Sequence, residues 1–370
     1  MLLILVATIS ILYAFFIANT YGSMDYQYSP AKLFIDKINP YEYYLYEDHS
    51  KIIGSQYPVY SHAAYIFFSA FSLLDWEISR FVWSIINLIL ASLCILIISK
   101  KAKLENHDMI IIGCIFFMST PFRNCIGNGQ LSLLVLVSYC SLFLDNSIKR
   151  NFLLGISYMK YSFMPVLAFF IFLKDGFIGL LVSGLFCLVG WIIFSLYLDQ
   201  SLLHTIFQPL AVGLKGFDST LARGDLFTIL NKYEYNLFNI KSSYWSIFLV
   251  IVVTFFLAKQ VSLKKDILLT LNLLLIINLL TFGHLIYDYL ILLPTFVYSF
   301  KNYNFIKAKI SIAIIMYFWF GIRIYEKIKI YVLDVDIIIP TNYDIFINFV
   351  LLIFLYFVNL NTKSSSLIKN

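Results

Sequence analysis

The stretch LLILVATISILYAFFIA, which runs from Leu2 to Ala18, contains no charged residue. A bilayer core about 30 Å thick needs about 20 mainly apolar residues in a helix, so this stretch predicts a membrane-spanning helix. No Lys or Arg precedes the stretch and no convincing small-x-small cleavage site follows it, which favours an uncleaved first span over a signal peptide. We therefore expect a chain that is held in the membrane from its first helix.

The composition of the whole chain extends this prediction. Of the 370 residues, 61% are hydrophobic and 13% are charged, whereas an average soluble domain has about 25% charged residues. The apolar residues occur in runs, not in the alternation typical of a β-barrel. Short clusters rich in Lys, Asn and Asp separate the runs. The sequence therefore predicts an all-α, polytopic transmembrane helical bundle with about ten to twelve spans.

The positive-inside rule orients the predicted spans. Lys and Arg gather in short turns, which we place in the cytoplasm together with both termini, whereas Asp and Glu lie mainly in the opposite loops. Residues 19–77 and 199–243 form the two sizeable outer loops. Within the first, Pro58 to Leu74 is predicted to be an amphipathic juxtamembrane element, because a span there would put the lysines at 100–103 outside.

No soluble domain, linker or internal repeat interrupts residues 1–370, which predicts a single integral domain in the plasma membrane. The five cysteines are isolated, mostly within apolar runs and without metal-ligand spacing, so we interpret them as small buried hydrophobes. Nothing in the first outer loop requires a divalent metal, and no cofactor is expected. The net charge of +6 reflects cationic loops and does not indicate a nucleic-acid partner.

Several apolar runs are too short for a bilayer that needs about 20 helical residues, so some are predicted to be half-helices that meet at a polar break inside the protein. The breaks with polar content are Pro121 to Gln130, Lys160 to Ser162 and Gly283 to His284. All three fall on the outer side of the predicted topology. Polar groups in a membrane are costly, so the side chains at these breaks are functional candidates.

Two of the breaks contain ionisable residues in apolar surroundings. Lys160 lies shortly before Pro165, and we expect its ammonium group to face a cavity and not lipid. His284, Tyr287 and Asp288 have helical spacings of three and four, which places them on one face of a helix. The alternative for this group is a His–Asp pair that only locks helices together.

The third break is a polar cluster around two glycines, Gly127 and Gly129. Its polar members are Arg123, Asn124, Asn128 and Gln130. Glycines let a backbone approach a ligand closely, although a Gly–Asn segment is also an ordinary turn. Combined with Lys160 and His284, the cluster suits an anionic headgroup such as a phosphate.

Short motifs follow one another along the chain in a recognisable order. They are Asp25 with Tyr28, Ala31 and Leu33; Ile38, Asn39, Pro40 and Tyr41; Tyr57 and Pro58; Trp83 and Asn87; Gly129 and Gln130; Gly155, Lys160 and Pro165; and His284, Tyr287 and Asp288. This order resembles glycosyltransferase family 87. Ile38 stands where the family pattern has a glycine, and Val59 stands where it has a second proline.

The resemblance implies an inverting membrane glycosyltransferase of the GT-C fold. Such an enzyme transfers a hexose, mannose in described members, from a polyprenyl-phosphate-linked sugar to a glycolipid or glycan acceptor at the outer face of the membrane. It also implies that Asp25 is the general base and that Lys160, Arg123 and His284 bind the donor phosphate. Supporting roles go to Gln130, Asp288, Tyr287, Tyr57, Asn39 and Tyr41.

The tyrosines of the first outer loop are open to two interpretations. They are Tyr41, Tyr43, Tyr44 and Tyr57. Their rings fit a wall on which a sugar stacks, and they fit equally well as anchors at the membrane interface, where Tyr is common.

Two other protein classes are compatible with a polytopic bundle that has outer polar residues. A transporter or glycolipid flippase would use the same cavity without forming a bond; transporters often have inverted repeats, and the halves of this chain show no such symmetry. An O-antigen-type polymerase would be expected to carry arginine-rich outer loops, and the loop 199–243 contains only Arg223.

Overall fold

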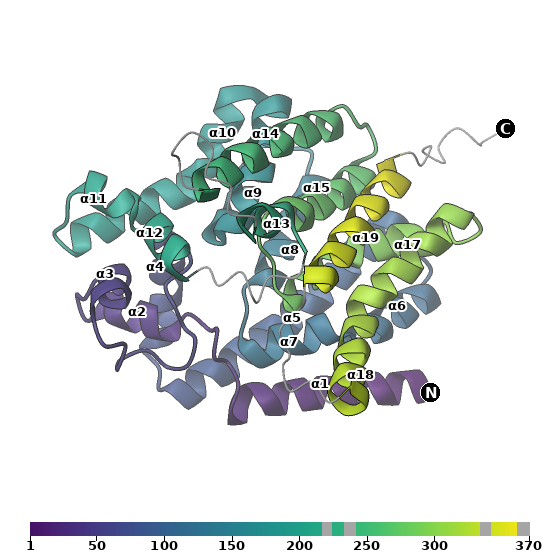
Figure 1. Cartoon of the computed structure of the whole chain (residues 1–370), viewed down its shortest axis with the longest axis horizontal. Helices are drawn as coiled ribbons and strands as arrows, with labels where there is room; N and C mark the ends of the chain where they lie inside the picture. Colours follow the sequence, from purple (N-terminus) through teal and green to yellow (C-terminus); the bar gives the residue numbers. More distant parts are fainter. Residues whose placement is uncertain (217–223, 233–241, 334–341, 361–370) are drawn as a thin grey trace. The chain divides into compact units, whose positions relative to one another are not determined.

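The computed structural model describes residues 1–216, 224–232, 242–333 and 342–360. Within these ranges every regular element is an α-, 3-10 or π-helix, and no strand is present (Figure 1). This confirms the predicted all-α class. The physical reason is that an apolar chain in lipid satisfies its backbone N–H and C=O groups most simply within each helix.

The chain divides into two compact units. The first unit comprises Met1–Cys94, Phe122–Met164 and Asp175–Phe217. Its helices are α1 (Leu2–Thr20), α2 (Tyr28–Ile35), α3 (Pro40–Tyr46), α4 (His62–Ser72), α7 (Thr120–Asn128), α8 (Ser132–Cys140), η1 (Ser141–Phe143), α9 (Ser147–Gly155), η2 (Ile156–Met159), η3 (Tyr161–Phe163), α11 (Leu202–Ile206) and α12 (Gln208–Gly216). Two long helices, α5 (Trp76–Ala102) and α10 (Met164–Tyr197), contribute to both units.

The second unit comprises Ile95–Pro121, Pro165–Lys174 and Asp218–Asn370. Its described helices are α6 (Asn106–Met118), α13 (Leu226–Lys232), α14 (Ser242–Ser262), α15 (Ile267–Thr281), η4 (Ile286–Leu292), α16 (Leu293–Lys301), α17 (Ile306–Met316), the π-helix η5 (Tyr317–Gly321), α18 (Ile322–Leu333) and α19 (Asn342–Leu360). The sequence-based expectation of one integral domain stays a prediction.

Long apolar helices make the chain a polytopic membrane protein. In the described ranges, six helices are long and apolar enough to cross a membrane, or seven if the bent pair α6 and α7 is one span. These six are Leu2–Thr20, Trp76–Ala102, Tyr161–Tyr197, Trp245–Ser262, Ile306–Ile330 and Tyr343–Leu360. The number is below the ten to twelve spans expected, because several apolar runs form shorter helices, among them Ser132–Phe143 and Ile267–Thr281.

The first predicted outer loop folds into the three short helices α2, α3 and α4. Helix α4 has 11 residues, which at 1.5 Å per residue is about half the length that a bilayer core requires. The segment Pro58 to Leu74 is therefore too short in helix to be a span, as the charge pattern predicts. Helix α4 packs against α2 through its buried side.

Two of the predicted interruptions are present in the backbone. Lys160 has φ −101° and ψ 101°, and it separates the 3-10 helices η2 and η3. The break predicted at Gly283 to His284 lies between the end of α15 at Thr281 and the start of η4 at Ile286. A further interruption lies within α10, where Gly176 has φ +70° and ψ −163°. A positive φ of this kind is readily adopted only by glycine.

The predicted break from Pro121 to Gln130 requires a correction. This segment is helical as far as Asn128, because Pro121 lies in the first turn of α7, where a missing N–H has no cost. The helix ends at Gly129, whose φ is +71°. The actual interruptions are at Ser119 and Gly129, one residue beyond each end of α7.

An aromatic cluster organises the core of the first unit around α5. The rings of Tyr26 and Trp83 are stacked, with centroids 5.7 Å apart, and Phe68 meets both edge-on. All three side chains are fully buried. Burial of one large apolar side chain contributes about 1.5–3 kcal/mol, and a well-oriented ring pair adds about 0.5–1.5 kcal/mol. This cluster therefore ties the segment after the first span to α4 and α5.

Close backbone contact joins α10 to α4. A Cβ atom placed on Gly190 would lie 2.6 Å from Cα and 2.9 Å from the backbone nitrogen of Ala63. Gly184, two turns earlier in the same helix, has nothing within 4 Å of the corresponding position. Alanine at either position changes the helix propensity of α10 in the same way, but only alanine at 190 would collide with α4.

We predict that Gly190→Ala lowers the stability of the protein by about 1–3 kcal/mol, the usual range for overpacking a close contact. Gly184→Ala should leave the stability unchanged or slightly higher, because alanine favours the helix. Thermal unfolding of both purified variants in one detergent measures the difference. Equal midpoints for the two variants would contradict the close contact between α4 and α10.

The imidazole of His62 links α4 to α11. Its Nε2 atom lies 3.0 Å from the backbone oxygen of Thr205, and the side chain is buried. Burial lowers the pKa of His62 from 6.5 to about 4, because a charged ring would lose its hydration. The neutral ring donates its Nε2 proton to the carbonyl.

We predict that His62 makes stability fall as pH falls from 6.5 to 4. In this window the unfolded chain binds a proton at His62 and the folded chain does not, so up to about 3 kcal/mol is lost below the lower value. His62→Gln keeps a donor for the carbonyl and removes the titration. The difference between wild-type and variant midpoints, measured across this pH range, should change steadily; a constant difference is incompatible with a buried neutral His62.

Candidate functional site

Asp25 lies in the turn between α1 and α2, and its backbone is attached to the end of α7. Its N–H donates to the oxygen of Asn128 at 3.1 Å, and the N–H of Ser23 donates to the oxygen of Gly127 at 2.6 Å. A Cβ atom on Gly22 would lie 2.3 Å from the Gly127 oxygen. The chain can approach so closely only because residue 22 is glycine. The side chain of Asp25 is partly exposed.

The segment that follows α7 forms a tight helix-ending turn. The N–H of Gly129 donates to the oxygen of Ile126, and the N–H of Gln130 donates to the oxygen of Cys125 at 2.9 Å. This pair of bonds, with a positive φ at Gly129, is the Schellman motif. The Gly129 oxygen accepts the indole N–H of Trp83 at 2.9 Å. The turn is thus fixed to both the helix before it and the aromatic cluster.

Side chains from two other segments meet this turn. The hydroxyl of Tyr60 donates to Oε1 of the buried Gln130 at 2.9 Å. The ammonium group of Lys160 donates to Oγ of Ser132 at 3.1 Å and lies 5.4 Å from the ring centre of Phe163. The backbone pairs as well, because the N–H of Ser61 donates to the oxygen of Met159.

Four of the predicted site residues therefore belong to one region of the first unit. Asp25 is attached to Asn128, Gln130 follows directly, and Lys160 reaches Ser132. Arg123 lies on α7, the helix that ends at Asn128, and is partly exposed. The region contains the partly exposed carboxylate of Asp25 and the cationic side chains of Lys160 and Arg123.

The predicted supporting residues of the first loop divide by exposure. Tyr41 is fully buried, and its hydroxyl donates to the oxygen of Tyr60 at 2.7 Å. Its ring therefore cannot serve as a sugar-stacking wall; the packing of His62 and Tyr65 around it has taken it into the core. Tyr57 is exposed, with its ring 4.9 Å from that of Tyr44, and keeps a face that a ligand can reach.

Asn39 has a structural position. Its side-chain oxygen caps α3 by accepting the N–H groups of Tyr41 and Glu42. Its Nδ2 donates to the side-chain oxygens of Gln200 and Gln208 at 2.6 and 2.9 Å. The Asn-Pro-Tyr motif thus begins a helix and connects the first outer segment to the segment after α10.

Several residues of this region were not anticipated from the sequence. Tyr60 joins Tyr41 to Gln130, and Gln56 joins the oxygen of Ser23 to the backbone and hydroxyl of Ser29. Glu42 pairs with His204 at 2.7 Å. All these contacts link positions distant in sequence, and only the Tyr-Pro motif just before Tyr60 offered a signal.

In the second unit, His284 and Asp288 contact each other, although His284 lies two residues before η4 and does not share one helix with Tyr287 and Asp288 as predicted. Nδ1 of His284 lies 3.2 Å from the Asp288 carboxylate, and Nε2 lies 2.7 Å from the oxygen of Asn278. Both side chains are buried, and Tyr287 beside them is nearly so. Each ring nitrogen thus faces a protein oxygen, so in this conformation the ring is held in place by the protein.

Asp225 adds a carboxylate that sequence reasoning missed. It is buried and accepts the N–H and the hydroxyl of Thr228 at 2.8 and 2.7 Å. Burial raises the pKa of Asp225, while these hydrogen bonds and the charge of His284 oppose the increase. The carboxyl caps the start of α13. The convergence of His284 with Lys160, which lie in different units, stays a prediction.

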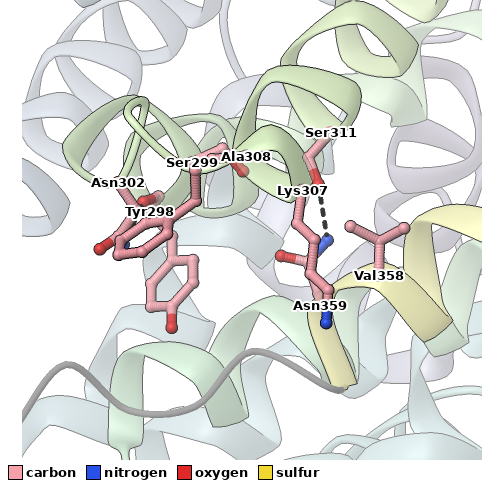
Figure 2. Close-up of a pocket in the computed structure, with 9 residues that line it drawn as sticks. Tyr298, Ser299, Asn302, Lys307, Ala308, Ser311, Val358 and Asn359 are labelled. Atoms are coloured by element: carbon pink, nitrogen blue, oxygen red, sulfur yellow. Dashed lines mark hydrogen bonds between the residues drawn. The ribbon is translucent and has the colours of Figure 1, made fainter.

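A small pocket in the second unit involves none of the predicted site residues. Figure 2 shows its side chains on α16, α17 and α19, with a hydrogen bond of 3.2 Å from Nδ2 of Asn359 to Oγ of Ser311. Its lining consists of Tyr298, Ser299, Asn302, Phe305, Lys307, Ala308, Ser311, Val358 and Asn359.

Across the described part of the chain, no three His, Cys, Asp or Glu side chains form a group suited to a metal ion.

We predict that Tyr60→Phe destabilises the protein by about 1–3 kcal/mol, because it leaves the buried Gln130 oxygen without this donor. Tyr57→Phe is the matched control and should change stability by less than about 0.5 kcal/mol, since its side chain is exposed. Thermal unfolding compares the two variants. A midpoint for Tyr60→Phe equal to that of the control would show that the hydrogen bond to Gln130 contributes nothing.

Comparison with known proteins places the chain in a family. The model of glycosyltransferase family 87 matches residues 59–282, which is more than half of the chain. The match includes Arg123, Gln130 and Lys160, whereas Asp25 and His284 lie outside it. No curated protein and no solved structure matches the chain. The chain belongs to glycosyltransferase family 87 and is therefore a glycosyltransferase of the polytopic membrane type.

Proposed function

We propose that this glycosyltransferase takes a hexose, mannose in the first instance, from a polyprenyl-phosphate-linked donor and transfers it to a glycolipid or glycan acceptor. The observation that carries the proposal is the attachment of Asp25 to Asn128, inside the region matched by the family. It brings a carboxylate from outside the match to the segment that also holds Gln130 and contacts Lys160. The proposed architecture is that of the GT-C fold.

Asp25 is the proposed general base. An acceptor hydroxyl attacks the anomeric carbon of the donor sugar, and Asp25 takes the hydroxyl proton as the new glycosidic bond forms. The bond from the anomeric carbon to the phosphate oxygen breaks on the opposite face, so the anomeric configuration inverts. The products are the glycosylated acceptor and polyprenyl phosphate. The fixed backbone of Asp25 suits this task, because a base must be held within about 2.6–3.2 Å of the proton it takes.

Lys160 and Arg123 are the proposed partners of the departing phosphate. Negative charge grows on this group as the bond breaks, and an ordered cation in a water-poor site stabilises it more than bulk water does. Lys160 suits the role because its ammonium group is already directed to Ser132 at the turn. His284, with Asp288 as its orienting partner, is proposed to complete the phosphate site.

The proposed place of reaction is the outer face of the plasma membrane. The cationic turns Lys149 and Arg150, Lys264 and Lys265, and Lys307 and Lys309 are assigned to the cytoplasm. This assignment puts the turn with Asp25 on the opposite side, together with the loop that contains α2 to α4. Partners of the protein are then a lipid-linked sugar donor, the acceptor and the surrounding membrane lipids.

We predict that Asp25→Asn lowers sugar transfer by about 100- to 10,000-fold, the usual contribution of a general base. Glu47→Gln makes the same carboxylate-to-amide change at an exposed site in the first loop and should retain activity. The assay uses membranes from cells in which the gene is deleted and which express the wild type or one variant. It follows labelled mannose from polyprenyl-phosphate-mannose into the lipid-linked glycans of these membranes.

Size-exclusion profiles and unfolding midpoints of both variants are compared with those of the wild type, because loss of transfer counts against the base only in a folded variant; the substitution leaves the backbone hydrogen bond from Asp25 to Asn128 in place. Retention of transfer by Asp25→Asn would refute the base assignment. A wild-type protein that moves lipid between leaflets and transfers no sugar from several such donors would refute the proposed reaction.

A further inference from the structure

Helices α11 and α12 carry a row of exposed apolar side chains. Its members are Leu202, Leu203, Ile206, Phe207 and Leu210. Leu203 and Phe207 are 77% and 65% exposed, values unusual for large apolar residues in a soluble environment. The spacing of three to four residues puts the row on one side of the helical segment. The segment is apolar but too short to cross a bilayer.

The other side of this segment is polar and is attached to the protein. Nε2 of His204 lies 2.7 Å from the Glu42 carboxylate, and Nε2 of Gln208 donates to the same carboxylate at 3.1 Å. Asn39 donates to Gln208 from the start of α3. Figure 1 shows α12 beside α3, as these bonds require. The hydrogen bonds therefore fix which side of α11 and α12 faces away from the first unit.

The depth of α11 follows from its contacts to α10. Oγ1 of Thr205 lies 2.6 Å from Oγ of Ser195 and accepts the indole N–H of Trp191 at 2.8 Å. Helix α10 ends at Tyr197, so at 1.5 Å per residue Ser195 and Trp191 lie about 3 and 9 Å below its end. Helix α11 thus folds back to the level of the last two turns of a candidate membrane span.

The exposed surface of that span continues onto α11. The last turns of α10 expose Leu188, Val189, Ile193 and Leu196, and Leu196 is 74% exposed. These residues belong to the apolar stretch long enough to cross a membrane. A Trp near the end of a span, with its N–H bound and its ring apolar, is typical of the membrane–water interface. The apolar row on α11 and α12 is therefore continuous with a lipid-facing surface.

We propose that α11 and the start of α12 lie in the bilayer, at the boundary between headgroups and acyl chains, with Leu203, Phe207 and Leu210 inserted among the lipids. The occupant of this surface is the membrane and not a second copy of the chain, because the surface extends a lipid-facing span and sits at the depth of its last turns. Residues 199–243 are predicted from the sequence to be a polar outer loop; under this proposal, the first part of that loop is a second juxtamembrane element. This inference uses only contacts within the first unit and does not depend on the proposed reaction.

Fluorescence quenching in vesicles tests the proposal. The full-length variants Leu203→Cys and Phe207→Cys carry an environment-sensitive nitrobenzoxadiazole label in phosphatidylcholine–phosphatidylglycerol vesicles. Glu47→Cys, exposed in the first loop, is the control. Labelled wild type gives the background, since four native cysteines are buried and Cys187 is partly so. Each labelled variant is measured in vesicles with and in vesicles without lipids that carry a nitroxide on the acyl chain. Iodide serves as the aqueous quencher.

Labels at 203 and 207 should emit at shorter wavelength than the label at 47. Their fluorescence should be quenched by the nitroxide lipids and not by iodide. The fluorescence of the label at 47 should be quenched by iodide and not by the nitroxide lipids. Iodide quenching at 203 and 207 equal to that at 47 would overturn the proposal, because the surface would then face water. Protection from both quenchers would also overturn it and would indicate a protein partner such as a second copy.

Discussion

The left-handed turn at Gly129 is the constraint on which the arrangement of the first unit depends. A Cβ atom there would lie 2.7 Å from that of Tyr26, and a φ of +71° is strained for other residues. The turn ends α7, presents its oxygen to Trp83 and starts the path to Ser132. The backbone of Asp25 is attached one residue before it, at Asn128, and the ammonium group of Lys160 three residues after it, at Ser132. One residue thus connects the segments to which Asp25 and Lys160 are attached.

Local patterns made part of this arrangement predictable. The sequence predicts His284 and Asp288 as neighbours on one helix; the two side chains are in contact, although His284 lies before the first residue of η4. The interruption at Lys160 is predicted by the presence of a charged residue within an apolar stretch. The helix α7 was missed because its Asn and Gly residues favour turns in isolation, whereas Pro121 in its first turn and its capped end favour a helix.

Other features could not be read from the chain because they join distant positions. Asn39 contacts Gln200 and Gln208, and Tyr60 contacts Gln130, through side chains that any polar loop might contain. Tyr41 lies in a predicted outer loop, where an aromatic side chain is expected at the surface, yet the neighbouring rings bury it. Charge counting likewise gives the side of a loop and not its depth, so it treats residues 199–243 as one polar loop.

The contacts of Lys160 have a thermodynamic consequence. A free lysine side chain has conformational entropy worth up to about 2 kcal/mol, which is lost when a bound anion immobilises it. Here the hydrogen bond to Ser132 and the ring of Phe163 restrict the chain during folding. In the proposed reaction, the donor phosphate at this turn meets an ammonium group that is already ordered. More of the attraction between the two charges then remains available as binding free energy.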